Sequence, residues 1–297
     1  MASRRQVYGT DQVFPDIEVE RGVRAGIGAT RTGTSGDRDA VLAQAADADA
    51  LLNMPLPLDG EAVAQAAGAV VATVPDYCEE EVAGHALALL RALLGRLPLV
   101  DSLVDAGAWG VQSPRPLQRL GGTMVGLGGH GRIARRLAEM PRPLGVRLRV
   151  HDPCVDPVGA LGVDLVAFEE LLGRADAAPR HGPLIQQTAG PIGAEQPAPT
   201  CGDAIPVNTS RGSRGRLEDL TVLPTGTIRG AGVDVFPEEP PHAGLFEGVP
   251  DPLLTSHVVH CSEVAIGESQ RQAATQILQA RTGRPPDHPA AVPTERR

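Results

Sequence analysis

At 297 residues the chain is longer than one average domain, so its length favours two domains. The net charge of −9 argues against nucleic acids and anionic membranes as partners, and no apolar run is long enough to cross a bilayer. The first residues, MASRRQVYGTD, lack the apolar segment of a secretory signal, and the four cysteines form no C-x-x-C pair. We therefore expect a cytoplasmic protein with free thiols and no metal site.

Short apolar segments alternate with helical patterns over residues 6–75. The strongest helix is expected at 79–97, EEEVAGHALALLRALLGRL, with acidic residues in its first turn and arginines in its second half. His85 inside this helix is interpreted as a packed or partly exposed side chain rather than a ligand. Leu-Pro-Leu-Val and then 107–119, rich in Gly, Pro and Gln, predict a crossing segment into the next domain.

The most specific signal is VGLGGHGRIARRLAEM, where three glycines have the spacing G-x-G-x-x-G. Gly126 is expected to let the chain turn out of a strand, Gly128 to let the backbone approach a diphosphate, and Gly131 to let the next helix pack closely. The helix start then offers N–H groups to the phosphates of a dinucleotide. The competing interpretation is an ordinary Gly-rich turn before an amphipathic helix.

Asp152 ends the apolar segment that follows the glycine motif, in RLRVHDP. A carboxylate at this point can accept hydrogen bonds from the adenosine ribose hydroxyls, and it repels a 2′-phosphate. The sequence therefore predicts NAD rather than NADP as the cofactor.

Strand and helix candidates alternate from 122 to 264, as in a doubly wound sheet. Strands are expected at 228–235 and 253–255, and a final helix at 263–281. The segment 177–206 has prolines where a central strand would lie, and proline removes ladder donors, so this segment argues against a strand.

Five motifs in this order closely resemble the D-isomer-specific 2-hydroxyacid dehydrogenases, in the branch with phosphoglycerate dehydrogenase-like and C-terminal-binding-protein-like members. They are VPDYCEEEVAGHALALL at 74–90, the glycine motif, VNTSRG at 207–212, GVDVFPEEP at 232–240 and LTSH at 254–257. The resemblance implies an α/β fold, with a Rossmann-type doubly wound parallel sheet inserted into a smaller flavodoxin-like substrate domain. The NAD-binding domain is then expected at 98–264, and the substrate domain at 1–97 and 265–297.

The resemblance also implies hydride transfer that interconverts a small 2-keto acid and a D-2-hydroxy acid. Arg211 is expected to hold the substrate through its fork of donors, and His257 to act as acid and base. Glu239 is expected to hydrogen-bond the far ring nitrogen of His257. His260 is a rival proton donor, less favoured because His257 directly follows a strand. The expected cofactor-binding residues are Gly126, Gly128, Gly129, His130, Gly131, Asp152, Thr209, Ser210, Arg211, Asp234 and His257.

Within that set, the resemblance places Gly129 and His130 at the pyrophosphate, 209–211 at the nicotinamide ribose and Asp234 near the nicotinamide. His130 departs from the family, which usually has an aliphatic residue there. The family resemblance and the long helix 79–97 also suggest a homodimer.

Two further departures leave alternatives open. Residues 54–69 are too short for the family loop that offers backbone N–H groups to the substrate carboxylate, and 177–206 loses its apolar strands. The alternatives are a catalytically weak or inactive NAD-binding regulatory protein, and a reductase for an unusual acid, larger or phosphonate-bearing. NADH oxidation with a panel of 2-keto acids, beside NADH binding, separates turnover from binding alone.

Overall fold

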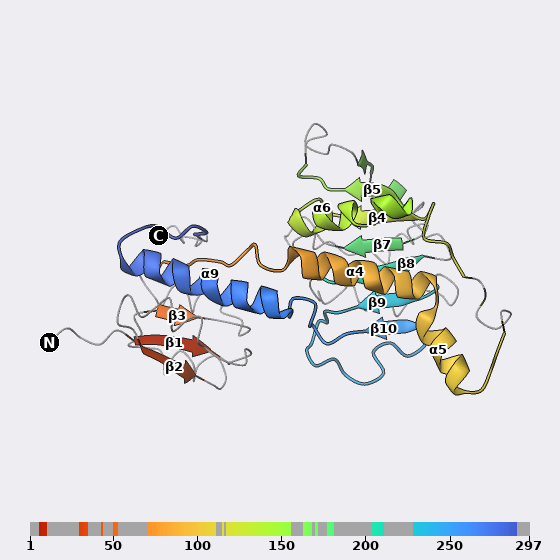
Figure 1. Cartoon of the computed structure of the whole chain (residues 1–297), viewed down its shortest axis with the longest axis horizontal. Coiled ribbons are helices and arrows are strands. Elements are labelled where there is room, and N and C mark those ends of the chain that lie inside the picture. Colours follow the sequence, from red (N-terminus) through yellow and green to blue (C-terminus); the bar gives the residue numbers. More distant parts are fainter. Residues whose placement is uncertain are drawn as a thin grey trace, which may run out of the picture. The chain divides into compact units, whose positions relative to one another are not determined.

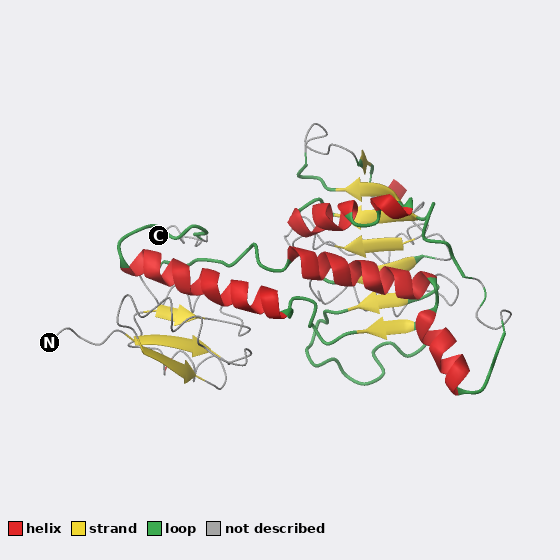
Figure 2. Ribbon diagram, viewed as in Figure 1, coloured by secondary structure: helices red, strands yellow, loops and turns green. Residues whose placement is uncertain are grey.

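The computed structural model divides into two compact units: Met1–Tyr77 with Ser262–Arg297, called the terminal unit, and Cys78–Cys261, called the central unit. Figure 1 labels their elements, and Figure 2 colours them by type. The structure describes residues 6–10, 30–34, 43, 50–52, 70–110, 115, 117–155, 163–167, 170–171, 177–180, 204–210 and 228–289.

The terminal unit contains a three-stranded parallel sheet of order β2-β1-β3, from β1 (Gln6–Thr10), β2 (Thr30–Thr34) and β3 (Ala50–Leu52). This order is the beginning of the flavodoxin-like order. Helix α9 (Glu263–Arg281) has the bounds that the sequence predicts, because the Ser262 hydroxyl caps it by accepting the Ala265 N–H. The short segment 54–69 lies outside the described residues.

The central unit is built on a seven-stranded sheet in which every recorded pairing is parallel, of order β10-β9-β8-β7-β4-β5-β6. The order reverses between β4 and β7, so this is the topological switch point of a doubly wound fold. The α/β class and the Rossmann-type sheet are therefore confirmed. The strands are β4 (Met124–Gly128), β5 (Arg147–His151), β6 (Asp164–Leu165), β7 (Ala177–Arg180), β8 (Ile205–Asn208), β9 (Ala231–Val233) and β10 (Pro252–Leu254).

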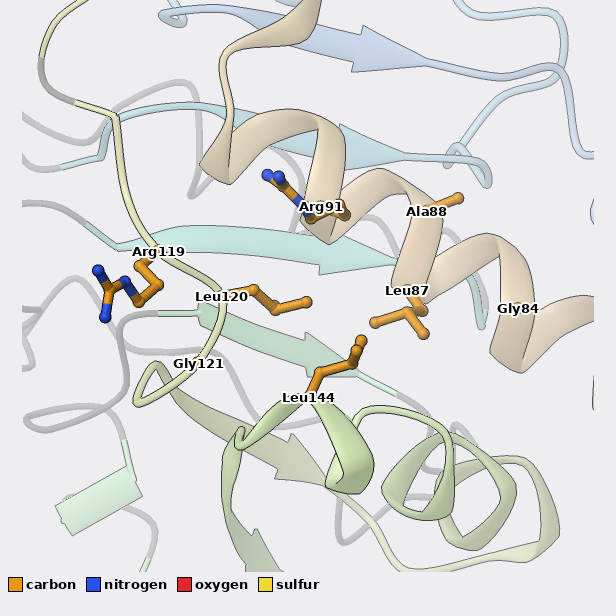
Figure 3. A pocket seen from close by; sticks show the side chains of 8 residues that line it. All are labelled: Gly84, Leu87, Ala88, Arg91, Arg119, Leu120, Gly121 and Leu144. Atoms are coloured by element: carbon orange, nitrogen blue, oxygen red, sulfur yellow. The ribbon is translucent and has the colours of Figure 1, made fainter.

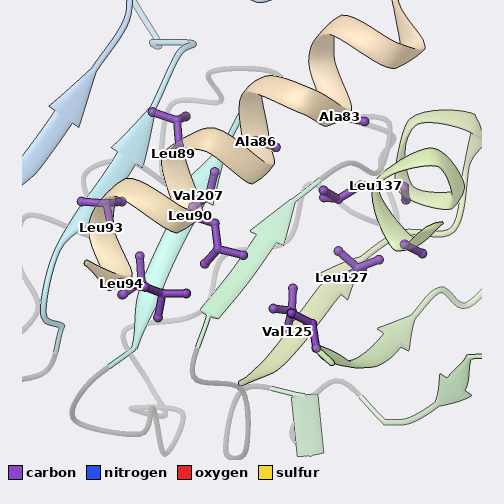
Figure 4. Packing of buried hydrophobic residues seen from close by; sticks show 14 of the residues in the cluster. Ala83, Ala86, Leu89, Leu90, Leu93, Leu94, Val125, Leu127, Leu137 and Val207 are labelled. Carbon is purple, nitrogen blue, oxygen red and sulfur yellow. The ribbon is translucent and has the colours of Figure 1, made fainter. Parts of the chain in front are cut away.

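Helices α4 (Glu79–Leu94) and α6 (Arg132–Glu139) pack on each other and on the central sheet, as Figure 1 shows. Figure 4 shows their apolar side chains meeting those of the strands in one core. A Cβ at Gly232 of β9 would lie 3.2 Å from Leu89 Cβ and from Leu93 Cδ1, so the missing side chain lets α4 approach the sheet closely. The labelled core residues are Ala83, Ala86, Leu89, Leu90, Leu93, Leu94, Val125, Leu127, Leu137 and Val207.

The helix expected at 79–97 is two helices in the structure. Helix α4 ends at Leu94, with Gly95 as its C-cap, and α5 (Leu97–Asp105) begins with a proline in its first turn. The Leu-Pro-Leu-Val part of the expected crossing segment, residues 97–100, is therefore helical. Proline suits the first turn because the N–H it lacks has no partner inside the helix.

The expectation against a strand in 177–206 is also wrong, because β7 lies between β4 and β8. Its register with β4 is recorded at Ala177 and Arg180 but not at the two residues between them, one of which is Pro179. Proline is tolerated here because the pairing with β4 is incomplete where the donor is missing. The η2 turn (Arg142–Leu144) follows α6, where Pro141 and Pro143 interrupt the helix. Residues 181–203 lie outside the described part of the chain.

The unit boundary falls earlier than the expected end of the first segment at 97. Helix α4 contacts β8, β9 and α6, so it belongs to the compact unit that begins at Cys78. At the other boundary, Gln272 and Gln276 of α9 donate hydrogen bonds to the carbonyls of Asp76 and Thr73. These bonds tie the middle of α9 to the segment that leads out of the terminal unit.

Candidate active site

The predicted site residues follow the carboxyl ends of neighbouring strands in the central sheet. Gly129 and His130 follow β4, Asp152 follows β5, and Thr209 and Ser210 follow β8. Asp234 directly follows β9, and His257 lies three residues after β10. Since the strands are parallel, these ends lie along one edge of the sheet, which is where doubly wound folds bind ligands.

The glycine motif forms the turn between β4 and α6. Strand β4 continues through Gly126 to Gly128, and the positive φ of +105° is at Gly129. The turn expected at Gly126 is therefore three residues later, because Gly126 is still paired in the sheet. Gly131 is the N-cap of α6, and a Cβ built there meets nothing within 4 Å.

Asp152 connects the end of β5 to the glycine motif. Its Oδ2 accepts the His130 N–H at 2.7 Å, and its Oδ1 accepts the Cys154 N–H at 2.9 Å. The Gly129 N–H donates to the His151 carbonyl at 2.8 Å. The carboxylate therefore fixes the loop that precedes α6 as well as standing at the position expected for a ribose partner.

These features fit a dinucleotide. The N-terminus of α6 has no side-chain cap, and a Cβ at its N-cap Gly131 would meet open space, which leaves room for a diphosphate. Asp234 is fully buried, and its Oδ2 has no hydrogen-bond partner among the described residues. A buried carboxylate oxygen without a partner is costly unless a ligand supplies a donor.

The imidazole of His130 is buried beside this loop, at 6% exposure. Burial, and next the positive charge of Arg135, lower its pKa from the ordinary 6.5, while the negative charge of Asp152 opposes the shift. The ring is therefore neutral near pH 7. Arg135 also donates from Nε to the His130 carbonyl at 3.0 Å, which holds the turn from the solvent side.

His257 and Glu239 meet on the far side of the same edge. Nδ1 of the imidazole lies 2.8 Å from Glu239 Oε2, and the other carboxylate oxygen accepts the Phe236 N–H at 3.0 Å. Both side chains are more than a third exposed. This contact leaves Nε2 of His257 as the ring nitrogen that can exchange a proton with a ligand.

The backbone at His257 has a φ of +55°, in the left-handed region that side chains with a Cβ rarely adopt. Asp234 holds this conformation from two sides: its carbonyl accepts the His257 N–H at 2.8 Å, and its Oδ1 accepts the Val258 N–H at 3.1 Å. Such strain concentrates at functional sites. His260 packs edge to face on His257, with ring centroids 5.5 Å apart.

Residues at the end of β8 and directly after it also lie at this edge of the sheet. The Asn208 side-chain oxygen accepts both the N–H and the hydroxyl of Ser210, and the Asn208 carbonyl accepts the Asp234 N–H. Thr209 is buried. Arg211, the expected substrate anchor, lies outside the described residues, so its place at this edge stays a prediction.

Sequence reasoning missed the hydrogen bond between His85 and Thr255. The Nε2 of His85, on α4, lies 3.2 Å from the Thr255 hydroxyl, although the two residues are 170 positions apart. The signal in the sequence is a histidine on an otherwise apolar helix face, which needs a polar partner if it is partly buried.

The described part of the chain contains neither a cluster of metal ligands nor a membrane-spanning helix. No three histidine, cysteine, aspartate or glutamate side chains gather there to hold a metal ion. No helix in these ranges is both long and apolar enough to span a bilayer.

Desolvation and then the charge of Asp234 raise the pKa of the Cys261 thiol, which makes this cysteine a poor nucleophile.

Comparison with known families gives one match that covers more than half of the chain. The model described as D-isomer specific 2-hydroxyacid dehydrogenase, NAD binding domain, matches residues 87–259. This range contains both the glycine motif and the His257–Glu239 pair.

Several curated relatives are similar over most of the chain. D-3-phosphoglycerate dehydrogenase of Mycobacterium tuberculosis is 31% identical over 274 residues, which cover 82% of this chain and 50% of the relative. Glyoxylate reductase of Korarchaeum cryptofilum is 32% identical over 228 residues, which cover 74% of this chain and 68% of the relative. Glycerate dehydrogenase of Methylorubrum extorquens is 31% identical over 217 residues, which cover 69% of this chain and 67% of the relative. The chain thus spans about half the length of the mycobacterial phosphoglycerate dehydrogenases that it matches.

Solved structures share the fold. The TT0316 protein from Thermus thermophilus has a TM-score of 0.82 at 25% identity, covering 96% of this chain and 100% of that one. An NAD-complexed D-isomer specific 2-hydroxyacid dehydrogenase from Lactobacillus delbrueckii has a TM-score of 0.78, and the match covers 96% of this chain and 100% of that one. At 19% identity the second likeness is one of fold alone.

Proposed function

The chain belongs to the D-isomer-specific 2-hydroxyacid dehydrogenase family, and from this premise we propose that it is an NAD-dependent oxidoreductase that interconverts a 2-keto acid and a D-2-hydroxy acid. The observation that carries the proposal is the His257–Glu239 contact, at the sheet edge that also carries the glycine loop. A strained histidine held against a carboxylate is the arrangement that proton transfer at this edge requires.

His257 is the acid and base of this proposal. In reduction its Nε2 gives a proton to the oxygen of the substrate carbonyl, and in oxidation the same nitrogen takes the hydroxyl proton. Glu239 fixes the ring by engaging Nδ1, and its charge stabilises the imidazolium that forms in oxidation. NADH, when bound, supplies the hydride.

The proposed cofactor-holding residues follow from the contacts of the loop. The first turn of α6, after Gly131, offers its N–H groups to the diphosphate, and Asp152 accepts the ribose hydroxyls. The partnerless Oδ2 of Asp234 is the acceptor for a donor on the nicotinamide side. Gly126, Gly128, Gly129, His130, Thr209 and Ser210 complete the set.

Arg211 is the proposed substrate anchor, because guanidinium holds a carboxylate with two parallel bonds. Arg211→Lys keeps the charge and loses this geometry, so we expect a higher KM for keto acids with little change in the NADH Kd. A matching loss of NADH binding would assign Arg211 to the cofactor instead.

The activity is tested by NADH oxidation with glyoxylate, hydroxypyruvate, pyruvate and longer 2-keto acids, beside direct titration of NADH binding. We expect turnover with at least one acid, and a product of D configuration by chiral chromatography. NADH binding without turnover of any of them would contradict the dehydrogenase proposal and favour a regulatory role.

We also propose a homodimer and a cytoplasmic location. Helix α5 buries none of its side chains in the single chain, and Trp109, shortly after it, is 93% exposed. A groove of about 650 Å³ runs along α4, lined by the eight residues that Figure 3 labels. Apolar surface of this extent favours a partner, and a second copy is the one we expect. Sedimentation of wild type against Trp109→Ser tests the dimer, which the variant should weaken, and a monomeric wild type would refute it. Cys154 and Cys261 are exposed free thiols, as a reducing compartment favours.

A further inference from the structure

Helix α4 reaches the proposed active site through a chain of two hydrogen bonds. His85 Nε2 lies 3.2 Å from the Thr255 hydroxyl oxygen, and the Thr255 hydroxyl lies 2.6 Å from Asp234 Oδ1. These three side chains come from α4, the end of β10 and the end of β9. They lie within the central unit.

The direction of each bond follows from the groups involved. A threonine hydroxyl has one proton, and the short contact with a carboxylate takes it, since a carboxylate can only accept. The Thr255 oxygen is then an acceptor toward His85, so His85 Nε2 must carry a hydrogen. The two hydrogen bonds therefore run from His85 through Thr255 to Asp234, and they fix the tautomer of His85.

The Asp234 oxygen at the end of this chain also supports the backbone at His257. Oδ1 accepts the Thr255 hydroxyl and the Val258 N–H, and the Asp234 carbonyl accepts the His257 N–H. The φ of +55° at His257 is unfavourable for a residue with a Cβ, so it persists only where contacts of this kind determine it. The position of the Asp234 carboxylate thus sets where the imidazole points.

Helix α4 is a rigid support for His85, the first residue in this series of hydrogen bonds. Ala86, Leu89 and Leu90, on the face next to His85, are at most 3% exposed. Side chains in a close-packed core have little freedom to move, and Leu89 of α4 (Figure 4) lies close against Gly232 of β9. The packing therefore keeps α4 in a fixed position on the sheet.

We propose that Thr255 and His85 are positioning residues, which hold the His257 backbone in its left-handed conformation through Asp234 and so aim the imidazole for proton transfer. This proposal rests on the proposed dehydrogenase function. Neither residue touches the reacting atoms in this scheme. Each acts by fixing the residue that follows it in the chain of bonds.

Thr255→Val removes the hydroxyl and keeps the shape of the side chain. We expect kcat to fall by roughly 10- to 100-fold, since a misplacement of about 1 Å costs on the order of 100-fold, and KM for NADH to change much less than kcat. Thr255→Ser keeps the hydroxyl and should retain most of the activity. Equal kcat in the Val and Ser variants would overturn the proposal.

A matched control separates positioning from folding. Thr123, just before β4, also has a buried hydroxyl, which donates to the Arg119 carbonyl at 2.7 Å. Thr123→Val should lower the melting temperature without a selective loss of kcat. If Thr255→Val lowers kcat and the melting temperature only as much as Thr123→Val does, the role of Thr255 is structural and the proposal is wrong.

His85 is tested by two variants and by spectroscopy. His85→Leu should lower kcat less than Thr255→Val, because it acts one bond further away, and His85→Gln should restore activity because its amide can donate to Thr255. Nitrogen-15 spectra of the unliganded protein should show His85 in the Nε2–H tautomer, and the His257 ring signals should move in Thr255→Val but not in Thr123→Val. The spectra need no turnover, so they test this inference even if no keto acid is reduced. An Nδ1–H tautomer at His85, or unmoved His257 signals, would refute it.

Discussion

His257 Nδ1 lies 2.8 Å from Glu239 Oε2, and the second oxygen of the same carboxylate accepts the Phe236 N–H at 3.0 Å. Glu239 is therefore held by the backbone at one oxygen while it orients the imidazole with the other. This arrangement commits one ring nitrogen of His257 and leaves the other for chemistry.

Replacing His257 by alanine should abolish most turnover and leave NADH binding nearly intact. Loss of a general acid–base group typically costs about 10²–10⁴-fold in rate. Steady-state rates with the best keto acid, beside NADH titration, measure both effects. His260→Ala is the control, because its ring contacts His257 from the side. If His260→Ala loses the rate and His257→Ala keeps it, the roles are exchanged.

Glu239→Gln should be milder than loss of the histidine, because glutamine keeps a polar contact with Nδ1 but loses the charge. An imidazolium without an anionic partner is less stable, so kcat for oxidation, the direction in which the imidazolium forms, should fall more than kcat for reduction. Steady-state rates in both directions of the reaction measure this. Equal losses in the two directions would show that the Glu239 charge does not act on the proton-transfer step.

Asp152 should decide between the two nicotinamide cofactors. Asp152→Asn removes the charge and keeps one oxygen, which can replace only one of the two carboxylate oxygens that now accept the His130 and Cys154 N–H groups. A hydrogen bond to a charged group contributes about 1.5–3 kcal/mol, so NADH affinity should fall about tenfold or more. NADPH should lose less, because the repulsion of its 2′-phosphate is relieved. Fluorescence titration gives both Kd values, and a wild type that prefers NADPH would show that Asp152 has another role.

The parts of the fold that the sequence predicts well have local causes. The glycine spacing predicts the turn between β4 and α6, and the final helix expected at 263–281 is α9 at the same bounds. The position of Asp152 after β5 follows from the length of one strand–helix–strand unit.

The parts that the sequence mispredicts depend on partners distant in sequence. Strand β7 forms in spite of Pro179 because β4 and β8 flank it, and no local pattern carries that information. Helix α5 is missed because a proline ends most helical patterns, although it is well tolerated in a first turn. The His85–Thr255 bond joins residues 170 positions apart, so only the assembled sheet brings them together.

Gly232→Ala should destabilise the central unit. The added Cβ would lie 3.2 Å from two leucines of α4, and overpacking of a filled core costs roughly 1–3 kcal/mol. Gly267→Ala in α9 is the matched control: nothing lies within 4 Å of a Cβ there, and alanine in a helix gains about 0.5–1 kcal/mol over glycine. Thermal unfolding measures both. Equal melting temperatures for the two variants would mean that α4 is not packed tightly against β9.

Protonation of His130 should weaken the fold at low pH. Burial, and next Arg135, lower the pKa of this imidazole from 6.5 in the folded chain. Below pH 6.5 the unfolded chain therefore takes up a proton that the folded chain does not, and the free energy of unfolding falls as the pH drops through this range. At about pH 8 both states are neutral at this position, so the effect is absent.

His130→Leu keeps an apolar body at the same buried place and removes the titrating group. Urea unfolding at about pH 8 and about pH 5.5 should show a smaller difference between the two conditions in this variant than in wild type. His242→Leu serves as the control, since His242 is exposed and its recorded ring contact is with the adjacent Ala243 carbonyl. If His130→Leu loses as much stability as wild type between the two conditions, the acid sensitivity comes from other groups. A smaller loss in His130→Leu alone would identify the buried imidazole beside the glycine loop as its source.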